Sequence, residues 1–317
     1  MSIRIAAALL LPFVTPSAQA TCAWHLLVSG YFSDNVAIYD ACSGAFLRQL
    51  EQEGHVHGAQ AVRVNPTDGL LYVVSERDDQ VQRYRPHAGY AFVDVFAQLD
   101  ADVDPTGLAF GSDGRVYVAS YGTSRVLELD PLDGSVIGTL LPTDSGLLGA
   151  DNGLMMSDAG LLYVPGYDSS SVARIDPATA QVQAAFVASG SGGLFETRGI
   201  VDEGATILVG GEGSGAIYRF DAATGAFVGT LVSGLNRPTG LAVAPDGSLL
   251  VLAGNRVRRY DRATGALLGT LADGADGGIS GGTFLAFVPN PEAIFDDGFE
   301  PGEAAPQRAQ PRRHEAP

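Results

Sequence analysis

Lysine is absent from this sequence of 317 residues, because all 19 of its basic residues are arginine. The absence excludes Schiff-base chemistry and a lysine general base. Acidic residues number 36, and the formal net charge is −17. Nucleic acid and anionic membrane surfaces both require clustered positive charge, so we expect neither as a partner. The acidic balance is interpreted as a contribution to solubility.

Long apolar runs are also scarce, and the first one lies at the N-terminus. Arg4 precedes an apolar stretch over residues 5–14, and a small-x-small pattern ends at Ala20. This order is typical of a secretory signal peptide cleaved after Ala20, and the stretch is too short to span a bilayer. We therefore expect a secreted or periplasmic protein, with no membrane insertion after cleavage.

Cysteine occurs only twice, as Cys22 and Cys42. In an oxidising compartment an even pair can form a lasting disulfide. A hairpin centred near Ser33 would bring the two positions together. We predict the Cys22–Cys42 bridge, which would hold the mature N-terminus to its neighbouring strand; two free thiols are the alternative.

No proline- or serine-rich linker divides the middle of the chain, and no nucleophile elbow or Walker loop is present. The predicted organisation is a signal peptide over residues 1–20, one domain over residues 21–290, and an acidic, aromatic segment with a disordered tail over residues 291–317. The domain is expected to be a monomer. Residues 291–300 resemble an ending found on secreted proteins of some Gram-negative bacteria, and we attach no chemistry to them.

A repeat dominates the domain. One unit begins with Asp104–Gly114 and continues with apolar or alternating runs separated by short turns. A second unit begins with Arg237–Gly247 and has its runs in the same order. Four such runs per unit indicate a four-stranded meander. Two landmarks recur at intervals of 40 to 46 residues. One is a glycine opening the first strand (Gly107, Gly153, Gly199, Gly240), and the other is an aspartate ending the third (Asp40, Asp130, Asp176, Asp221, Asp261), with Arg85 in that place in the second unit.

Counting strands predicts how the repeat closes. The segment over residues 24–50 supplies only three strands, at residues 25–31, 36–40 and 45–50. The missing innermost strand is found at the far end of the domain, at residues 283–289. Because such a strand would remove the open edge between first and last units, the sequence predicts an all-β, six-bladed β-propeller of four-stranded antiparallel blades.

The repeat resembles known propeller families. The segment Arg237–Gly247 is similar to NHL repeats, and Val64–Val73 resembles the YVTN family of surface propellers. Together these resemblances cover nearly all of residues 24–290. They imply a propeller architecture, but such propellers include enzymes, scaffolds and ligand-binding modules, so they imply no particular activity.

The connections between blades and those between second and third strands should share one face of a propeller. The residue before each first-strand glycine should point to the channel mouth on that face. The aligned positions form a polar ring with one positive charge: Gln60, Thr106, Asn152, Arg198, Thr239 and Thr283. Two interpretations stay open: a pocket for a polar or anionic small molecule, in which Arg198 is a charge-assisted donor, or a channel whose polar groups satisfy one another and trapped water.

The segment around Asn152 also resembles the senescence-marker and gluconolactonase family of six-bladed propellers. That resemblance implies a divalent metal such as calcium in the channel, with Asn152 as a ligand. The position where the family would carry a metal-binding aspartate holds Arg198, which would repel a divalent ion. No cofactor is therefore predicted, and calcium is the alternative.

Two further metal candidates are weak. His55 and His57 alternate in the loop entering the second blade, and alternate histidines can chelate zinc or copper. No other inter-blade loop contains a histidine, so surface histidines are the preferred interpretation. The run Glu76–Asp79 could bind calcium, but a solvated loop is preferred.

Two classes of function are carried forward. The first is a non-catalytic binding or interaction propeller for a small polar ligand or a protein partner. The second is a gluconolactonase-like hydrolase or lyase that uses a divalent metal. The binding class is preferred because no complete catalytic or metal-ligand set is present, so no catalytic residue is predicted.

Overall fold

The structure is a computed structural model that describes residues 22–50 and 54–293. The predicted signal peptide and most of the predicted C-terminal segment lie outside the described residues. Within them the chain forms 24 β-strands and four short 3-10 turns. None of the helices in this part of the chain is long and apolar enough to cross a membrane.

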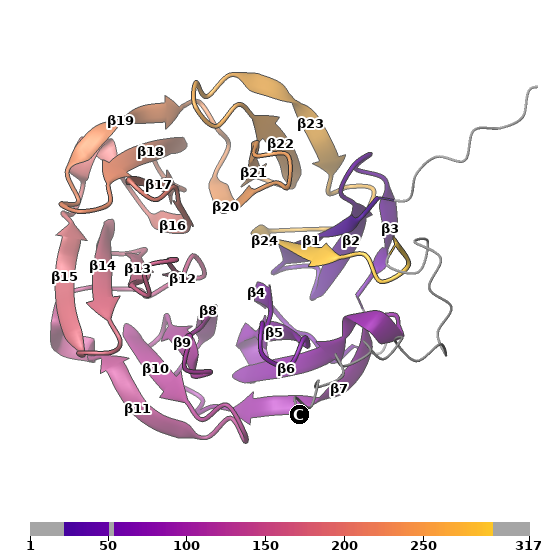
Figure 1. The fold of residues 1–317 in the computed structure, drawn as a ribbon, viewed down its shortest axis with the longest axis horizontal. Helices are drawn as coiled ribbons and strands as arrows, with labels where there is room; N and C mark the ends of the chain where they lie inside the picture. Colours follow the sequence, from indigo (N-terminus) through magenta and orange to yellow (C-terminus); the bar gives the residue numbers. More distant parts are fainter. Residues whose placement is uncertain (1–21, 51–53, 294–317) are drawn as a thin grey trace, which may run out of the picture.

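The strands form six separate four-stranded antiparallel sheets around a central axis (Figure 1). Blade 1 contains β24 (Gly282–Pro289), β1 (Trp24–Gly30), β2 (Asn35–Asp40) and β3 (Phe46–Gln49). Blade 2 contains β4 (Ala59–Val64), β5 (Leu71–Ser75), β6 (Gln80–Arg85) and β7 (Ala91–Gln98). Blade 3 contains β8 (Pro105–Phe110), β9 (Val116–Ser120), β10 (Arg125–Leu129) and β11 (Val136–Leu141).

The second half of the ring repeats this order. Blade 4 contains β12 (Met155–Met156), β13 (Leu162–Gly166), β14 (Ser171–Asp176) and β15 (Gln181–Val187). Blade 5 contains β16 (Thr197–Asp202), β17 (Thr206–Gly211), β18 (Ala216–Asp221) and β19 (Phe227–Val232). Blade 6 contains β20 (Pro238–Val243), β21 (Leu249–Ala253), β22 (Arg256–Tyr260) and β23 (Leu267–Asp273).

The predicted closure is confirmed. Strand β24 pairs with β1 in antiparallel register, with Leu27 opposite Ala286. In Figure 1 the yellow β24 accordingly lies beside the indigo β1 and β2. The first blade is thus completed by the last strand, and the ring has no unpaired edge between its first and last blades.

Apolar side chains on both faces of each sheet pack against the neighbouring blades. One cluster joins blades 1, 2 and 3, and four further clusters lie at the remaining contacts between neighbouring blades. Tyr72 and Tyr117 are among the largest fully buried side chains. This continuous apolar packing explains why the middle strands read as almost unbroken apolar runs.

A β-bulge recurs near the start of the innermost strands. The register shifts between Ala59 and Val62 in blade 2, between Pro105 and Gly107 in blade 3, and similarly in blades 5 and 6. A bulge re-aims a side chain away from the regular alternation of a strand. In these four blades the shift falls at a residue that lines the mouth of the channel: Gln60, Thr106, Arg198 and Thr239.

The recurrent first-strand glycine has a packing cause. A Cβ atom added to Gly107 would lie 2.6 Å from the carbonyl oxygen of Asp151, and one added to Gly153 would lie 2.1 Å from that of Arg198. Neighbouring innermost strands therefore approach so closely that a side chain does not fit at these positions.

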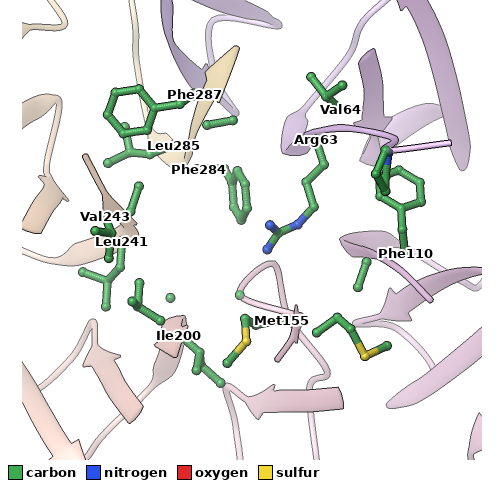
Figure 2. A pocket seen from close by; sticks show the side chains of 18 residues that line it. Arg63, Val64, Phe110, Met155, Ile200, Leu241, Val243, Phe284, Leu285 and Phe287 are labelled. Atoms are coloured by element: carbon green, nitrogen blue, oxygen red, sulfur yellow. The ribbon is translucent and has the colours of Figure 1, made fainter. Parts of the chain in front are cut away.

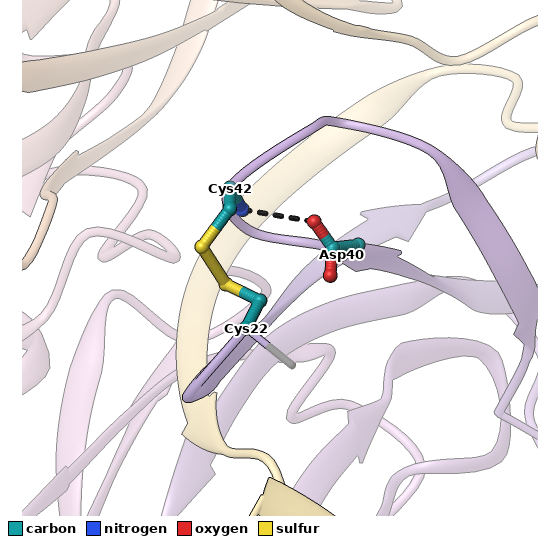
Figure 3. Close-up of side chains that lie close together, drawn as sticks. All are labelled: Cys22, Asp40 and Cys42. Atoms are coloured by element: carbon teal, nitrogen blue, oxygen red, sulfur yellow. Dashed lines mark hydrogen bonds between the residues drawn. A yellow bond between two sulfur atoms is a disulfide. The ribbon is translucent and has the colours of Figure 1, made fainter. Parts of the chain in front are cut away.

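The predicted disulfide is present. Cys22 and Cys42 are bonded, with their Cα atoms 5.9 Å apart (Figure 3). Beside it the carboxylate of Asp40 accepts the backbone N–H of Cys42 at 3.1 Å and that of Ser43 at 2.7 Å. The bridge links the segment preceding β1 to the turn that follows β2, where the sequence placed it.

Candidate ligand-binding site at the channel mouth

One end of the central channel opens into a pocket of about 520 Å³. Its lining residues come from the starts of innermost strands and from the loops between second and third strands, the two positions predicted to share a face. Five of the six residues of the predicted ring line it: Gln60, Thr106, Arg198, Thr239 and Thr283. The sixth, Asn152, is fully buried.

The threonines of this ring connect neighbouring blades. The hydroxyl of Thr106 donates to the carbonyl of Ala150 in the segment entering blade 4, at 3.0 Å. That of Thr239 donates to Gly282 at 2.8 Å, and that of Thr283 donates to Ala59 at 2.8 Å. Their hydroxyl protons are therefore engaged by backbone acceptors of the next blade, which assigns these side chains a structural role in the absence of a ligand.

Asn152 crosses the channel from blade 4 to the opposite wall. Its Nδ2 donates to the side-chain oxygen of Gln60 in blade 2 at 3.2 Å and to the carbonyl of Thr283 in blade 1 at 3.0 Å. Asn152 lies before β12, and its backbone N–H donates to the Asp151 carboxylate at 2.6 Å. Because its buried side chain spans the channel, Asn152 forms a floor for the mouth pocket.

A second ring, which the sequence analysis did not identify, surrounds the first. The residue following each second strand reaches the mouth face, and the aligned positions are Tyr31, Glu76, Tyr121, Tyr167, Glu212 and Gly254. All of these except Tyr167 line the pocket. The same self-alignment that produced the first ring contains this signal, since the positions recur at the blade period and five of the six are tyrosine or glutamate.

Arg198 is neutralised by the protein itself. Its guanidinium forms ion pairs with Glu212 and, at 3.3 Å, with Asp151, and it lies over the ring of Tyr167 at 4.8 Å. Both carboxylates are almost fully buried. Burial alone would lower the pKa of Arg198, but the two carboxylates outweigh it and raise the pKa. The side chain is therefore less available to an anionic ligand than the sequence suggested.

Glu212 also pairs with Arg237, whose side chain is 67% exposed at the rim. The pocket therefore contains a linked group of two guanidiniums and two carboxylates, Arg198, Arg237, Asp151 and Glu212. Opposite charges in such a group compensate one another, so it presents fixed hydrogen-bonding groups more than net charge.

Glu76 is the third carboxylate of the pocket, and it has a different environment. No basic side chain of the described residues lies within ion-pair distance of the Glu76 carboxylate. The carboxylate accepts a hydrogen bond from the Gln60 amide instead. Burial raises the pKa of Glu76 to about 7, and the nearby carboxylates of Asp151 and Asp104 act in the same direction. A carboxyl group with such a pKa can accept or release a proton near neutrality.

The histidine candidates are held by other contacts. His55 stacks on Phe92 with ring centroids 4.3 Å apart, and His57 Nδ1 lies 2.8 Å from the carboxylate of Asp78. Over residues 22–50 and 54–293, three or more histidine, cysteine or acidic groups come within mutual ligand distance only at Cys22, Asp40 and Cys42, where the sulfurs form the disulfide. Three carboxylates or histidines of the mouth do not converge in this way.

The chain is a six-bladed β-propeller with a polar pocket at one end of its axis. No family model matches the sequence. No curated protein matches it. Its similarity to known proteins is therefore one of fold.

Three solved structures illustrate this similarity. The fold resembles a chain of a nidogen–laminin complex with a TM-score of 0.70 and 14% identity, over 84% of this chain and 99% of that one. It resembles a Bacteroides caccae protein of unknown function with a TM-score of 0.65 and 15% identity, over 84% and 99% of the two chains. A catalytically inactive virginiamycin B lyase from Staphylococcus aureus, with quinupristin, gives a TM-score of 0.58 and 10% identity, over 80% and 86%.

Proposed function

We propose that this protein is a binding propeller whose mouth pocket takes a small polar molecule that is neutral or cationic. The observation that carries the proposal is the composition of the pocket wall. Three carboxylates face two guanidiniums, and Glu76 accepts a hydrogen bond from an amide where the others are paired with arginine. A ligand hydroxyl or amine would supply a second donor to the Glu76 carboxylate, beside the Gln60 amide.

Aromatic residues at the rim support the same class of ligand. Tyr31, Phe32 and Tyr121 line the pocket, and Phe32 is 68% exposed. Flat aromatic surfaces beside polar groups suit ligands with both apolar faces and hydroxyls or amines, and the cationic members gain from the ring faces. An anionic ligand is disfavoured because both arginines already have carboxylate partners.

Export remains part of the proposal. The Cys22–Cys42 disulfide supports an oxidising compartment, and the predicted signal peptide and the resemblance of residues 291–300 point to secretion or a periplasmic location in a Gram-negative bacterium. We further propose that the protein acts as a monomer and binds neither nucleic acid nor membrane.

A panel of neutral sugars, amino acids, polyamines and sugar acids tests the pocket by thermal shift, followed by calorimetry of any hit. We expect hits among the neutral or cationic compounds, with binding at least tenfold weaker in Glu76→Gln, since a charge-assisted hydrogen bond contributes about 1.5 to 3 kcal/mol. Asp133→Asn, in an exposed turn, is the matched control. Hits confined to sugar acids, or affinities that Glu76→Gln leaves unchanged, would contradict the proposal.

A second candidate, the metal-dependent hydrolase or lyase, draws its support from Glu76. A carboxyl group with a pKa of about 7 could serve as a general acid or base. Arg198, however, pairs with the carboxylates that a divalent cation would need. Metal analysis of the purified chain decides: one tightly held calcium or other divalent ion per chain, lost in Asn152→Ala, would favour the enzyme.

The protein-partner alternative uses the same face. Phe195 and Leu148 are 54% and 51% exposed on the connections entering blades 5 and 4, beside the mouth. Exposed apolar residues on loops are common at protein contacts. If a partner protein binds this face, the Phe195→Ser variant should retain less of that partner than the wild-type chain does in a pull-down experiment.

A further inference from the structure

The opposite end of the channel contains a second cavity with different chemistry. It encloses about 500 Å³ and is formed where the innermost strands of all six blades end. Its wall is mainly apolar, and its lining residues include Phe110, Met155, Met156, Leu241, Phe284 and Phe287. None of the residues that line it within the described part of the chain is acidic.

Arg63 is the one basic residue in this wall. Figure 2 shows its side chain extending from β4 toward the middle of the cavity, with Phe284 and Met155 nearby. Its Nε donates to the carbonyl of Leu108 at 2.7 Å and its Nη2 to that of Leu154 at 2.8 Å. These bonds to blades 3 and 4 hold the guanidinium plane in place.

The charge of this guanidinium has no partner among the described residues. No carboxylate of the described residues lies within ion-pair distance of the Arg63 guanidinium. Its Nη1 donates no hydrogen bond to any of these residues. The other favourable contact is with the ring of Phe284, 5.0 Å from the guanidinium carbon. Burial lowers the pKa of Arg63 to about 10, so the group still carries its charge at pH 7.

Arg63 is half-buried in this mainly apolar wall, where two carbonyl oxygens and the Phe284 ring contact it but no carboxylate does, so an anion that brings its own apolar body would suit the cavity. Arg198, at the other end of the same channel, has two buried carboxylates beside it. The two ends therefore differ in what they offer: both arginines of the mouth are paired with carboxylates, whereas the Arg63 cavity contains an arginine and no carboxylate.

We propose that the Arg63 cavity is a second binding site, for a small carboxylate with an apolar body such as a medium-chain fatty acid. The carboxylate would bind the free Nη1 edge of Arg63, and the chain would lie among Met155, Met156 and Phe110. The site is independent of the mouth pocket, because Asn152 spans the channel between the two ends.

The methionines provide a direct probe. The sequence contains three, and both of those within the described residues, Met155 and Met156, line the cavity. The chain labelled with ¹³C at the methionine methyl groups is titrated with octanoate, and the two resonances are assigned with Met156→Leu. We expect saturable shifts of both methyl groups with octanoate.

Related compounds separate the charge from the apolar body. Octanoate should bind at least tenfold more tightly than 1-octanol and octylammonium, which keep the chain and lose or reverse the charge, and acetate should cause no shift. Absence of shifts with octanoate at millimolar concentration, or an equal response to octanol, would overturn the proposal.

Variants then test the residue. Arg63→Met should weaken octanoate binding at least tenfold, and Arg63→Lys should retain most of it; Arg256→Met, an exposed arginine paired with Asp273 on the other face, is the control. If Arg63→Met does not fold, the relative affinities of the wild-type chain for octanoate, 1-octanol, octylammonium and acetate test the proposal. Unchanged binding in a folded Arg63→Met would refute the site, whereas Glu76→Gln should affect only the mouth ligand.

Discussion

At the scale of single residues, Glu76 links the mouth pocket to pH. Its pKa in the folded protein is about 7, above the ordinary value of 4.5 because the group is buried. The folded state therefore binds this proton more strongly than the unfolded state between those two values. By linkage, the contribution of Glu76 to the free energy of unfolding is greatest at low pH and is lost as the pH rises through about 7.

The prediction compares wild-type protein with Glu76→Gln at pH 5 and pH 8 by urea denaturation. Wild type should lose about 2 kcal/mol more than the variant between the two pH values, from the size of the shift. Asp133→Asn should behave as wild type, because hydrogen bonds from Ser135 lower the pKa of Asp133 and place its titration below this window. Parallel pH profiles for wild type and Glu76→Gln would show that Glu76 ionises normally.

The two arginines that bind Glu212 should differ sharply in their contribution to stability. Arg198→Met leaves two buried carboxylates with reduced compensation and should lower the free energy of unfolding by about 3 kcal/mol. Arg237→Met removes a pair whose arginine is exposed to solvent and should cost less than about 1 kcal/mol. Chemical denaturation of both variants measures this. Equal losses would mean that Arg237 is the main partner of Glu212.

At the scale of strands, the repeat made most of the architecture predictable. Turn chemistry, first-strand glycines and the deficit of one strand in residues 24–50 depend on local sequence, and they led to six blades and to the closing strand. The first mouth ring followed from the same alignment, since five of its six members line one pocket.

The contacts across the channel were beyond that reasoning. Asn152 reaches Gln60, 92 positions away in sequence, and Arg63 reaches Leu154, 91 positions away. Such contacts depend on which side chains fill the axis after the ring has closed, and no local pattern specifies that. For the same reason the pairing of Arg198 with Glu212 and the apolar cavity around Arg63 could be seen only in the structure.

Strand β24 should be essential for a cooperative fold, because it supplies the innermost strand of blade 1 and contacts β20 and β4 on either side. A chain ending after Gly281 should lose its cooperative thermal transition and aggregate, since β1 would present an open edge. The matched control is a chain ending after Ala293, which keeps β24 and should unfold as the full chain does. A cooperative transition in the shorter chain would show that five complete blades and one three-stranded blade are sufficient.

At the scale of the whole molecule, Asn152 connects opposite sides of the ring and separates its two cavities. Asn152→Ala removes two buried hydrogen bonds and leaves the Gln60 oxygen and the Thr283 carbonyl without that donor, so the free energy of unfolding should fall by about 2 kcal/mol. Asn255→Ala is the control. That asparagine lines the mouth and accepts one backbone N–H at 3.3 Å, so its replacement should cost less than about 1 kcal/mol.

The same variant should also join the two cavities. With the side chain removed, water can pass between the mouth and the apolar end, and the methyl resonances of Met155 and Met156 should shift from their wild-type positions. In wild type the floor formed by Asn152 should block that passage. If Asn152→Ala is as stable as wild type and its methionine signals are unchanged, the channel is closed by its backbone rather than by this side chain, and the two binding sites owe their independence to the innermost strands.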